Sequence, residues 1–256
     1  MRRRITHGIM TPLAIAGVAA VLAGGVRAQT DPFPDLVTRL ETAAVNGKVD
    51  AIRTERVNAM RMLAGATGPS ADLLRYTVAY GAWRLAFATS VSPSDQVAML
   101  EDAEAQLQRV LTTSPDNVES LALMSAVEGA RIAQNPDLGM TLGMKSSMQI
   151  DRAQRLAPSN PRVLVMSGLA LYNTPPEYGG SIPDAEKKLG AALAAFAKEP
   201  ASKPWPNWGR FDAHVWLGQA RAHRGDKVGA RAEYEAALVI APESDWVRYA
   251  LLPLVK

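Results

Sequence analysis

The chain has 256 residues, with 28 Lys and Arg against 25 Asp and Glu, and it contains no cysteine. The lack of cysteine excludes disulfide staples and thiolate metal sites, and the nearly balanced charge excludes a basic nucleic-acid surface. A chain of this length can bury a sizeable core without staples.

Residues 1–28 have the pattern of an export signal. Residues 1–4 are basic apart from Met1, residues 8–25 are mostly apolar, and small residues precede Gln29. The alternative is a retained membrane anchor, for which the apolar run is marginal in length. Cleavage would leave 24 basic and 25 acidic residues, a net charge of −1. We therefore expect a periplasmic or secreted protein without stable membrane insertion.

Residues 29–68 are predicted to form an N-terminal helical pair. An apolar stripe runs through residues 35–46, and a second helix is expected over residues 48–64. Asn46 and Gly47 separate the two, because both residues accept the left-handed backbone of a helix end.

Residues 69–243 contain four copies of one helix-hairpin pattern. Each copy has one small residue in its first helix and one in its second, and these let the two backbones approach closely. A larger residue follows four positions after the small residue of the second helix. The first-helix residues are Gly81, Ser125, Gly168 and Gly218; the second-helix residues are Ala103, Ser146, Ala185 and Ala230; the larger residues are Leu107, Ile150, Leu189 and Tyr234. Spacings of three and four place such residues on one helical face.

The fourth copy carries a family resemblance. Its motif residues are Leu217, Gly218, Gly225, Asp226, Ala230, Tyr234, Ala237 and Pro242. This pattern resembles the tetratricopeptide (TPR) signature. The resemblance implies an all-α, right-handed TPR-like helical-hairpin solenoid that acts as a protein-interaction scaffold. The alternative is an ordinary helical bundle with chance spacing.

The repeats are longer than the family's. Closing prolines recur every 42 or 43 residues, whereas the plain motif has about 34 residues. The extra residues fall between the two helices of the first three repeats, which predicts extended intra-repeat loops on one edge. For the first two repeats, longer helices are an equal alternative.

The third insertion contains Tyr178, Gly179 and Gly180, which we predict to be binding residues at the loop edge. The loop resembles the aromatic-Gly-Gly loop of exported bacterial TPR proteins, including the helper component of TRAP-type transporters. That resemblance implies a periplasmic solute-binding protein as partner. The alternative is a rigid turn that starts the next helix at Pro183.

Residues 244–256 are predicted to form a capping helix, since the last repeat of a solenoid has no neighbour to cover it. Trp246, Tyr249 and residues 252–254 are expected to provide the covering face.

The sequence contains no motif for catalysis, so we expect a protein that is not an enzyme and has no cofactor. His214 and His223 are nine residues apart on one predicted helix and so point to different faces, which disfavours a metal site. Met140, Met144 and Met148 form a stripe that we assign to the core or the groove; copper binding through thioethers is the alternative.

In TPR proteins the first helix of each repeat lines a concave groove. The groove residues expected here are mostly apolar: Val78, Ala82, Leu85, Ala122, Ala126, Val165, Leu169, Tyr172, Val215 and Gln219. Arg75 and Arg162 flank them, without the full set of a carboxylate clamp. We predict an exported scaffold that binds a partner protein or peptide of unknown identity through this groove. The alternative is a helper of a TRAP-type transporter that handles an apolar ligand.

Overall fold

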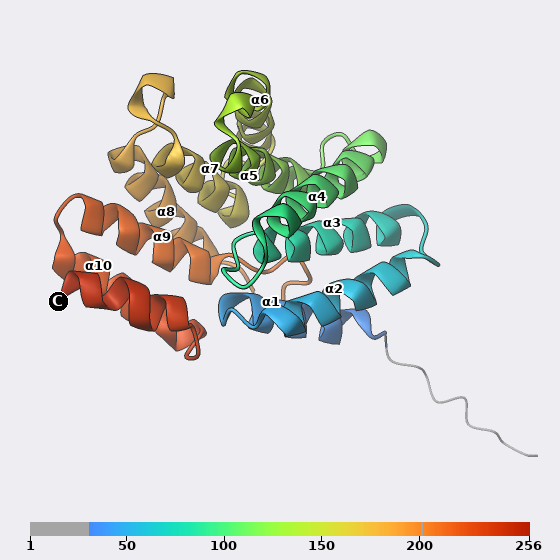
Figure 1. Cartoon of the computed structure of the whole chain (residues 1–256), viewed down its shortest axis with the longest axis horizontal. Coiled ribbons are helices and arrows are strands. Elements are labelled where there is room, and N and C mark those ends of the chain that lie inside the picture. Colours follow the sequence, from blue (N-terminus) through green and yellow to red (C-terminus); the bar gives the residue numbers. More distant parts are fainter. Residues whose placement is uncertain (1–30, 201) are drawn as a thin grey trace, which may run out of the picture. The chain divides into compact units, whose positions relative to one another are not determined.

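The computed structural model describes residues 31–200 and 202–256, and its regular elements within these ranges are all helices (Figure 1). The predicted signal segment lies outside them. The α-helices are α1 (Phe33–Val45), α2 (Val49–Leu63), α3 (Gly68–Leu85), α4 (Pro93–Thr113), α5 (Val118–Gln134), α6 (Gly139–Leu156), α7 (Pro161–Asn173), α8 (Ile182–Phe196), α9 (Arg210–His223) and α10 (Lys227–Ile240). None of these helices is long and apolar enough to cross a membrane.

The helices pack in successive pairs, from α1 on α2 to α9 on α10. The odd-numbered helices α3, α5, α7 and α9 also contact one another in order and form one layer of the array. This arrangement confirms the predicted all-α helical solenoid.

Small residues set the spacing inside three of the hairpins, as predicted. A Cβ added to Gly218 would lie 2.5 Å from the Tyr234 ring, and one added to Gly168 would lie 2.7 Å from Leu189. In the second hairpin the Ser125 and Ser146 hydroxyls are 3.0 Å apart. The first copy differs, because Gly81 faces Arg56 of the preceding helix α2 rather than α4.

The extra residues of the first two repeats mainly lengthen helices. α3 and α4 span 18 and 21 residues, whereas α9 and α10 span 14 each. In the second repeat a short 3₁₀ turn, η1 (Pro136–Leu138), leads directly into α6. The prediction of extended loops is therefore wrong for these two repeats, where the alternative of longer helices holds.

The cap after α10 is not an α-helix. It consists of a single π-helical turn, η3 (Trp246–Leu251), followed by the 3₁₀ turn η4 (Leu252–Val255). Its covering residues are Val247, Leu251 and Val255, which pack against Tyr234 and other residues of α10. Of the predicted covering residues, Leu252 packs partly buried against this cluster, whereas Trp246, Tyr249 and Leu254 are exposed at 46%, 70% and 71%.

The first hairpin contacts the last one. Val45 at the end of α1 belongs to the same apolar cluster as Tyr234 and Val247. The Asn46 side-chain oxygen accepts a hydrogen bond of 2.9 Å from the Glu243 backbone N–H, and Lys48 pairs with the Glu243 carboxylate at 3.0 Å. The beginning and the end of the helical array are thus joined.

Candidate functional site

Most predicted groove residues lie in the core. Six of them are at most 2% exposed: Val78, Ala82, Leu85, Ala122, Val165 and Val215. The prediction that these six side chains form a binding surface is therefore wrong. Four others are partly exposed: Ala126, Leu169, Tyr172 and Gln219.

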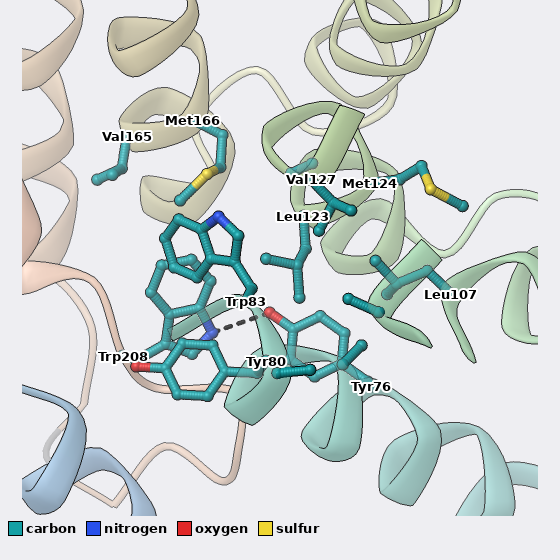
Figure 2. Close-up of a cluster of buried hydrophobic side chains, with 14 of the residues drawn as sticks. Tyr76, Tyr80, Trp83, Leu107, Leu123, Met124, Val127, Val165, Met166 and Trp208 are labelled. Atoms are coloured by element: carbon teal, nitrogen blue, oxygen red, sulfur yellow. Dashed lines mark hydrogen bonds between the residues drawn. The ribbon is translucent and has the colours of Figure 1, made fainter. Parts of the chain in front are cut away.

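Two tryptophans from the connection between α8 and α9 fill the predicted groove. Trp205 and Trp208 are 7% and 2% exposed and belong to the main apolar cluster. The Trp208 ring lies 5.0 Å from that of Tyr80 and 5.9 Å from that of Trp83, centroid to centroid. Figure 2 shows the Trp83 and Trp208 indoles together with Met166 of α7 in this buried cluster. This part of the inner face is closed by the protein's own chain.

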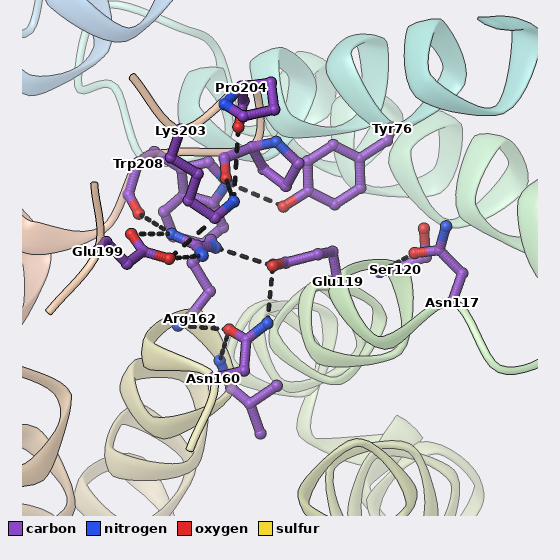
Figure 3. A network of polar contacts seen from close by, with 12 residues as sticks. Tyr76, Asn117, Glu119, Ser120, Asn160, Arg162, Glu199, Lys203, Pro204 and Trp208 are labelled. Atoms are coloured by element: carbon purple, nitrogen blue, oxygen red, sulfur yellow. Dashed lines mark hydrogen bonds and ion pairs between the residues drawn. The ribbon is translucent and has the colours of Figure 1, made fainter. Parts of the chain in front are cut away.

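A buried arginine fastens that connection. Arg162 at the start of α7 is 1% exposed, not at the rim of a groove as expected. Its guanidinium binds Glu119 at 2.9 Å, Glu199, and the backbone oxygen of Trp208 at 3.3 Å (Figure 3). Burial lowers the pKa of Arg162, but the hydrogen bonds and charges of Glu199 and Glu119 outweigh it, so the pKa is raised overall. The guanidinium therefore stays charged and holds the connection against α5 and α7.

A second polar network joins α1, α3 and α9. Arg84 forms a two-pronged ion pair with Asp212, at 2.7 and 2.6 Å. It also donates a 2.9 Å hydrogen bond to the Tyr80 hydroxyl, which in turn donates to Glu41. Burial raises the pKa of the Glu41 carboxyl to about 7, although the charge of Arg84 opposes the rise. The network is structural, since Asp212 and Tyr80 are buried.

The aromatic surface that remains open is formed by Tyr172, Trp216 and Trp246, which we call the aromatic ledge. These rings come from α7, α9 and η3. The Tyr172 and Trp216 rings meet edge to face at 5.3 Å, and the Trp216 and Trp246 rings do so at 6.4 Å. Burial raises the pKa of Tyr172, as expected for a partly covered phenol. Three linked rings thus reach the surface, with the most exposed one in the cap.

Two polar side chains border the ledge. Trp216, Gln219 and His223 follow one another at intervals of three and four, so they share one face of α9. The Gln219 amide nitrogen is buried and has no hydrogen-bond partner among the described residues. The exposed His223 ring lies 6.5 Å from Tyr172. The ledge therefore combines aromatic rings with an exposed imidazole, and ligand sites commonly combine apolar surface with a few polar groups.

The loop edge is built as a rigid turn with one exposed ring. Gly179 has φ of +95°, and a Cβ on Gly180 would overlap the Thr174 carbonyl oxygen at 1.6 Å. Both glycines are thus needed by the backbone. Tyr178, which lies in the 3₁₀ turn η2 (Pro176–Tyr178), is 79% exposed and remains available to a partner.

The methionine stripe is on the surface. Met140, Met144 and Met148 of α6 are 96%, 72% and 64% exposed, so their assignment to the core is wrong. Among the described residues, no three His, Cys, Asp or Glu side chains are grouped to hold a metal ion. An open cavity of about 510 Å³ lies between α3 and α4, with Asp72, Arg75 and Arg109 among the residues of its walls.

Comparisons with known proteins show a structural likeness. No family model matches the chain, and no curated sequence matches it. A similar solved structure is that of the HusA haemophore from Porphyromonas gingivalis. The two chains are 26% identical with a TM-score of 0.58, and the alignment covers 72% of this chain and 94% of the haemophore. The chain described here therefore shares its helical architecture with a binding protein.

Proposed function

We propose that this protein is an exported binding protein of the TPR-like type, and not an enzyme, and that it captures a flat apolar ligand on the aromatic ledge. The observation that carries the proposal is the linked set of rings, Tyr172, Trp216 and Trp246, which reaches the surface while the other three tryptophans are buried. An exposed apolar surface of this kind marks a binding site.

The ligand class we propose is the tetrapyrrole. The similar solved structure is that of a haemophore, and its likeness extends over most of both chains. A porphyrin is a rigid aromatic disc with polar groups at its rim. Such a ligand matches aromatic rings bordered by the exposed His223 imidazole.

A titration tests this proposal. Protoporphyrin IX and ferric haem are added to the purified protein lacking residues 1–28, and quenching of tryptophan fluorescence is followed together with porphyrin absorbance. We expect saturable one-to-one binding that Trp246→Ala weakens at least tenfold. Phe87→Ala is the matched control, because Phe87 is also an exposed ring, at 60%, but contacts Trp83 instead. Equal losses in both variants, or no binding by the unaltered protein, would refute the proposal.

A protein partner is the second candidate. The exposed methionines of α6 favour it, since three thioether side chains give an adaptable apolar surface. Crosslinking from a photoreactive residue at position 144 in periplasmic extract would identify such a partner, with position 50 on α2 as an exposed control. The Tyr178–Gly180 loop supports a role as the helper of a TRAP-type transporter. A gene neighbourhood without transporter subunits would count against that role.

A further inference from the structure

His223 is the polar group of the ledge that packing does not explain. It lies in the last turn of α9 and is exposed. No hydrogen bond or ion pair of the described residues engages its ring nitrogens; its recorded contact is the edge-to-face approach to Tyr172. His214 on the same helix is different, since its Nδ1 lies 2.7 Å from the Glu233 carboxylate.

The surroundings of His223 suit a metalloporphyrin better than a purely organic ligand. His223 is two helical turns from Trp216 on the same face of α9, and Tyr172 contacts both rings, at 5.3 Å from Trp216 and 6.5 Å from His223. An imidazole nitrogen with a free lone pair therefore stands beside the apolar rings. Haem sites in proteins offer a donor side chain for the iron, commonly the imidazole of a histidine, and apolar contacts for the macrocycle.

We infer that His223 is the protein ligand of the haem iron on the aromatic ledge, an inference that rests on the proposed function. In the bound state one imidazole nitrogen donates its lone pair to the iron, and the other keeps its proton. The described residues supply no other imidazole to the ledge, because His214 is bound to Glu233.

The test compares two variants against two ligands. His223→Ala and the matched control His214→Gln are each titrated with ferric haem and with metal-free protoporphyrin IX, and the Soret band and the electron paramagnetic resonance spectrum of the haem complex are recorded. We expect His223→Ala to bind haem at least tenfold more weakly, with an altered Soret band, and to bind protoporphyrin IX within twofold of the unaltered protein. Added free imidazole should restore the spectrum. His214→Gln should match the unaltered protein on both ligands.

The outcomes separate the two proposals. If His223→Ala binds haem with unchanged affinity and spectrum, the coordination is overturned while the porphyrin-binding function stands. If the unaltered protein binds neither ligand, both are overturned. If His223→Ala loses both ligands equally while its circular dichroism and melting are unchanged, His223 acts as a packing surface and the coordination is again overturned.

Discussion

The indole nitrogen of Trp208 donates a 2.8 Å hydrogen bond to the hydroxyl oxygen of Tyr76, a residue 132 positions earlier in the chain. This bond lies inside the helical array and ties the connection between α8 and α9 to α3. It accounts for the difference between the open groove of the sequence prediction and the filled interior of the structure.

Removing the Trp208 ring should strongly destabilise the fold. Trp208→Ala is expected to cost about 3–5 kcal/mol in the free energy of unfolding, because a fully buried ring leaves a cavity. Tyr76→Phe should cost about 1–3 kcal/mol, since it leaves the indole N–H unpaired. Urea denaturation followed by circular dichroism measures both. A Trp208→Ala variant as stable as the unaltered protein would show that the connection does not belong to the core.

Glycine substitutions should separate packing from helix propensity. Gly218→Ala is expected to destabilise by about 1–3 kcal/mol, because the new methyl group would overlap the Tyr234 ring. Gly129→Ala in α5 should instead stabilise by about 0.5–1 kcal/mol, since nothing lies within 4 Å of the added atom. Thermal melts of the two variants should therefore shift in opposite directions. Shifts of the same sign would contradict the assigned contact between α9 and α10.

A buried carboxyl should make stability fall as the pH rises. Burial, aided by the charge of Glu104, raises the pKa of Glu128 from its ordinary 4.5 to about 7. Between these two values the folded state keeps a proton that the unfolded state has released, so stability is lost as the pH increases. Each pKa unit corresponds to about 1.4 kcal/mol.

The variant Glu128→Gln tests this pH dependence. We expect its melting temperature to exceed that of the unaltered protein at pH 8 and the two to converge near pH 5, where Glu128 is protonated in the fold. Some slope should persist, because the Glu41 pKa is also raised to about 7. Glu177→Gln on the surface is the control. An equal gain at both pH values would mean that Glu128 is not titrating in this range.

Tyr172→Ala should affect both stability and binding. The ring is half-buried against Trp216, so we expect a loss of roughly 1–2 kcal/mol, from one edge-to-face pair and the burial of part of the ring. Binding of protoporphyrin IX should weaken as well, while Tyr172→Phe should keep both properties. Calorimetric melts and fluorescence titration measure the two effects. Normal porphyrin affinity in Tyr172→Ala would remove this ring from the ledge.

The hairpins could be predicted from the sequence because their contacts are local and periodic. Gly168 with Leu189, and Gly218 with Tyr234, pair residues about 20 positions apart on two helices with fixed spacing. The filled interior could not be predicted in this way. Trp205 and Trp208 lie in an aperiodic stretch that contains Pro204 and Pro206, and their aromatic partners on α3 are more than 100 residues away.

The candidate site was predicted only in part, for a related reason. Tyr172 and Gln219 were found as positions on the first helices of their repeats, whereas Trp246 was expected to be part of the cap's covering face. The cap forms a π-helical turn in place of an α-helix. As a result, Val247 and Leu251 pack against α10 in place of Trp246, and the Trp246 ring lies beside that of Trp216.

The junction of Asn46 and Lys48 with Glu243 has a consequence for how this architecture can change. In an open solenoid each repeat contacts only its neighbours, so units are gained or lost at the ends with little effect elsewhere. Here an inserted or deleted hairpin would separate Asn46 from Glu243 and Arg84 from Asp212. The number of hairpins is therefore fixed by closure, and we expect the array to unfold as one cooperative body instead of fraying from its ends.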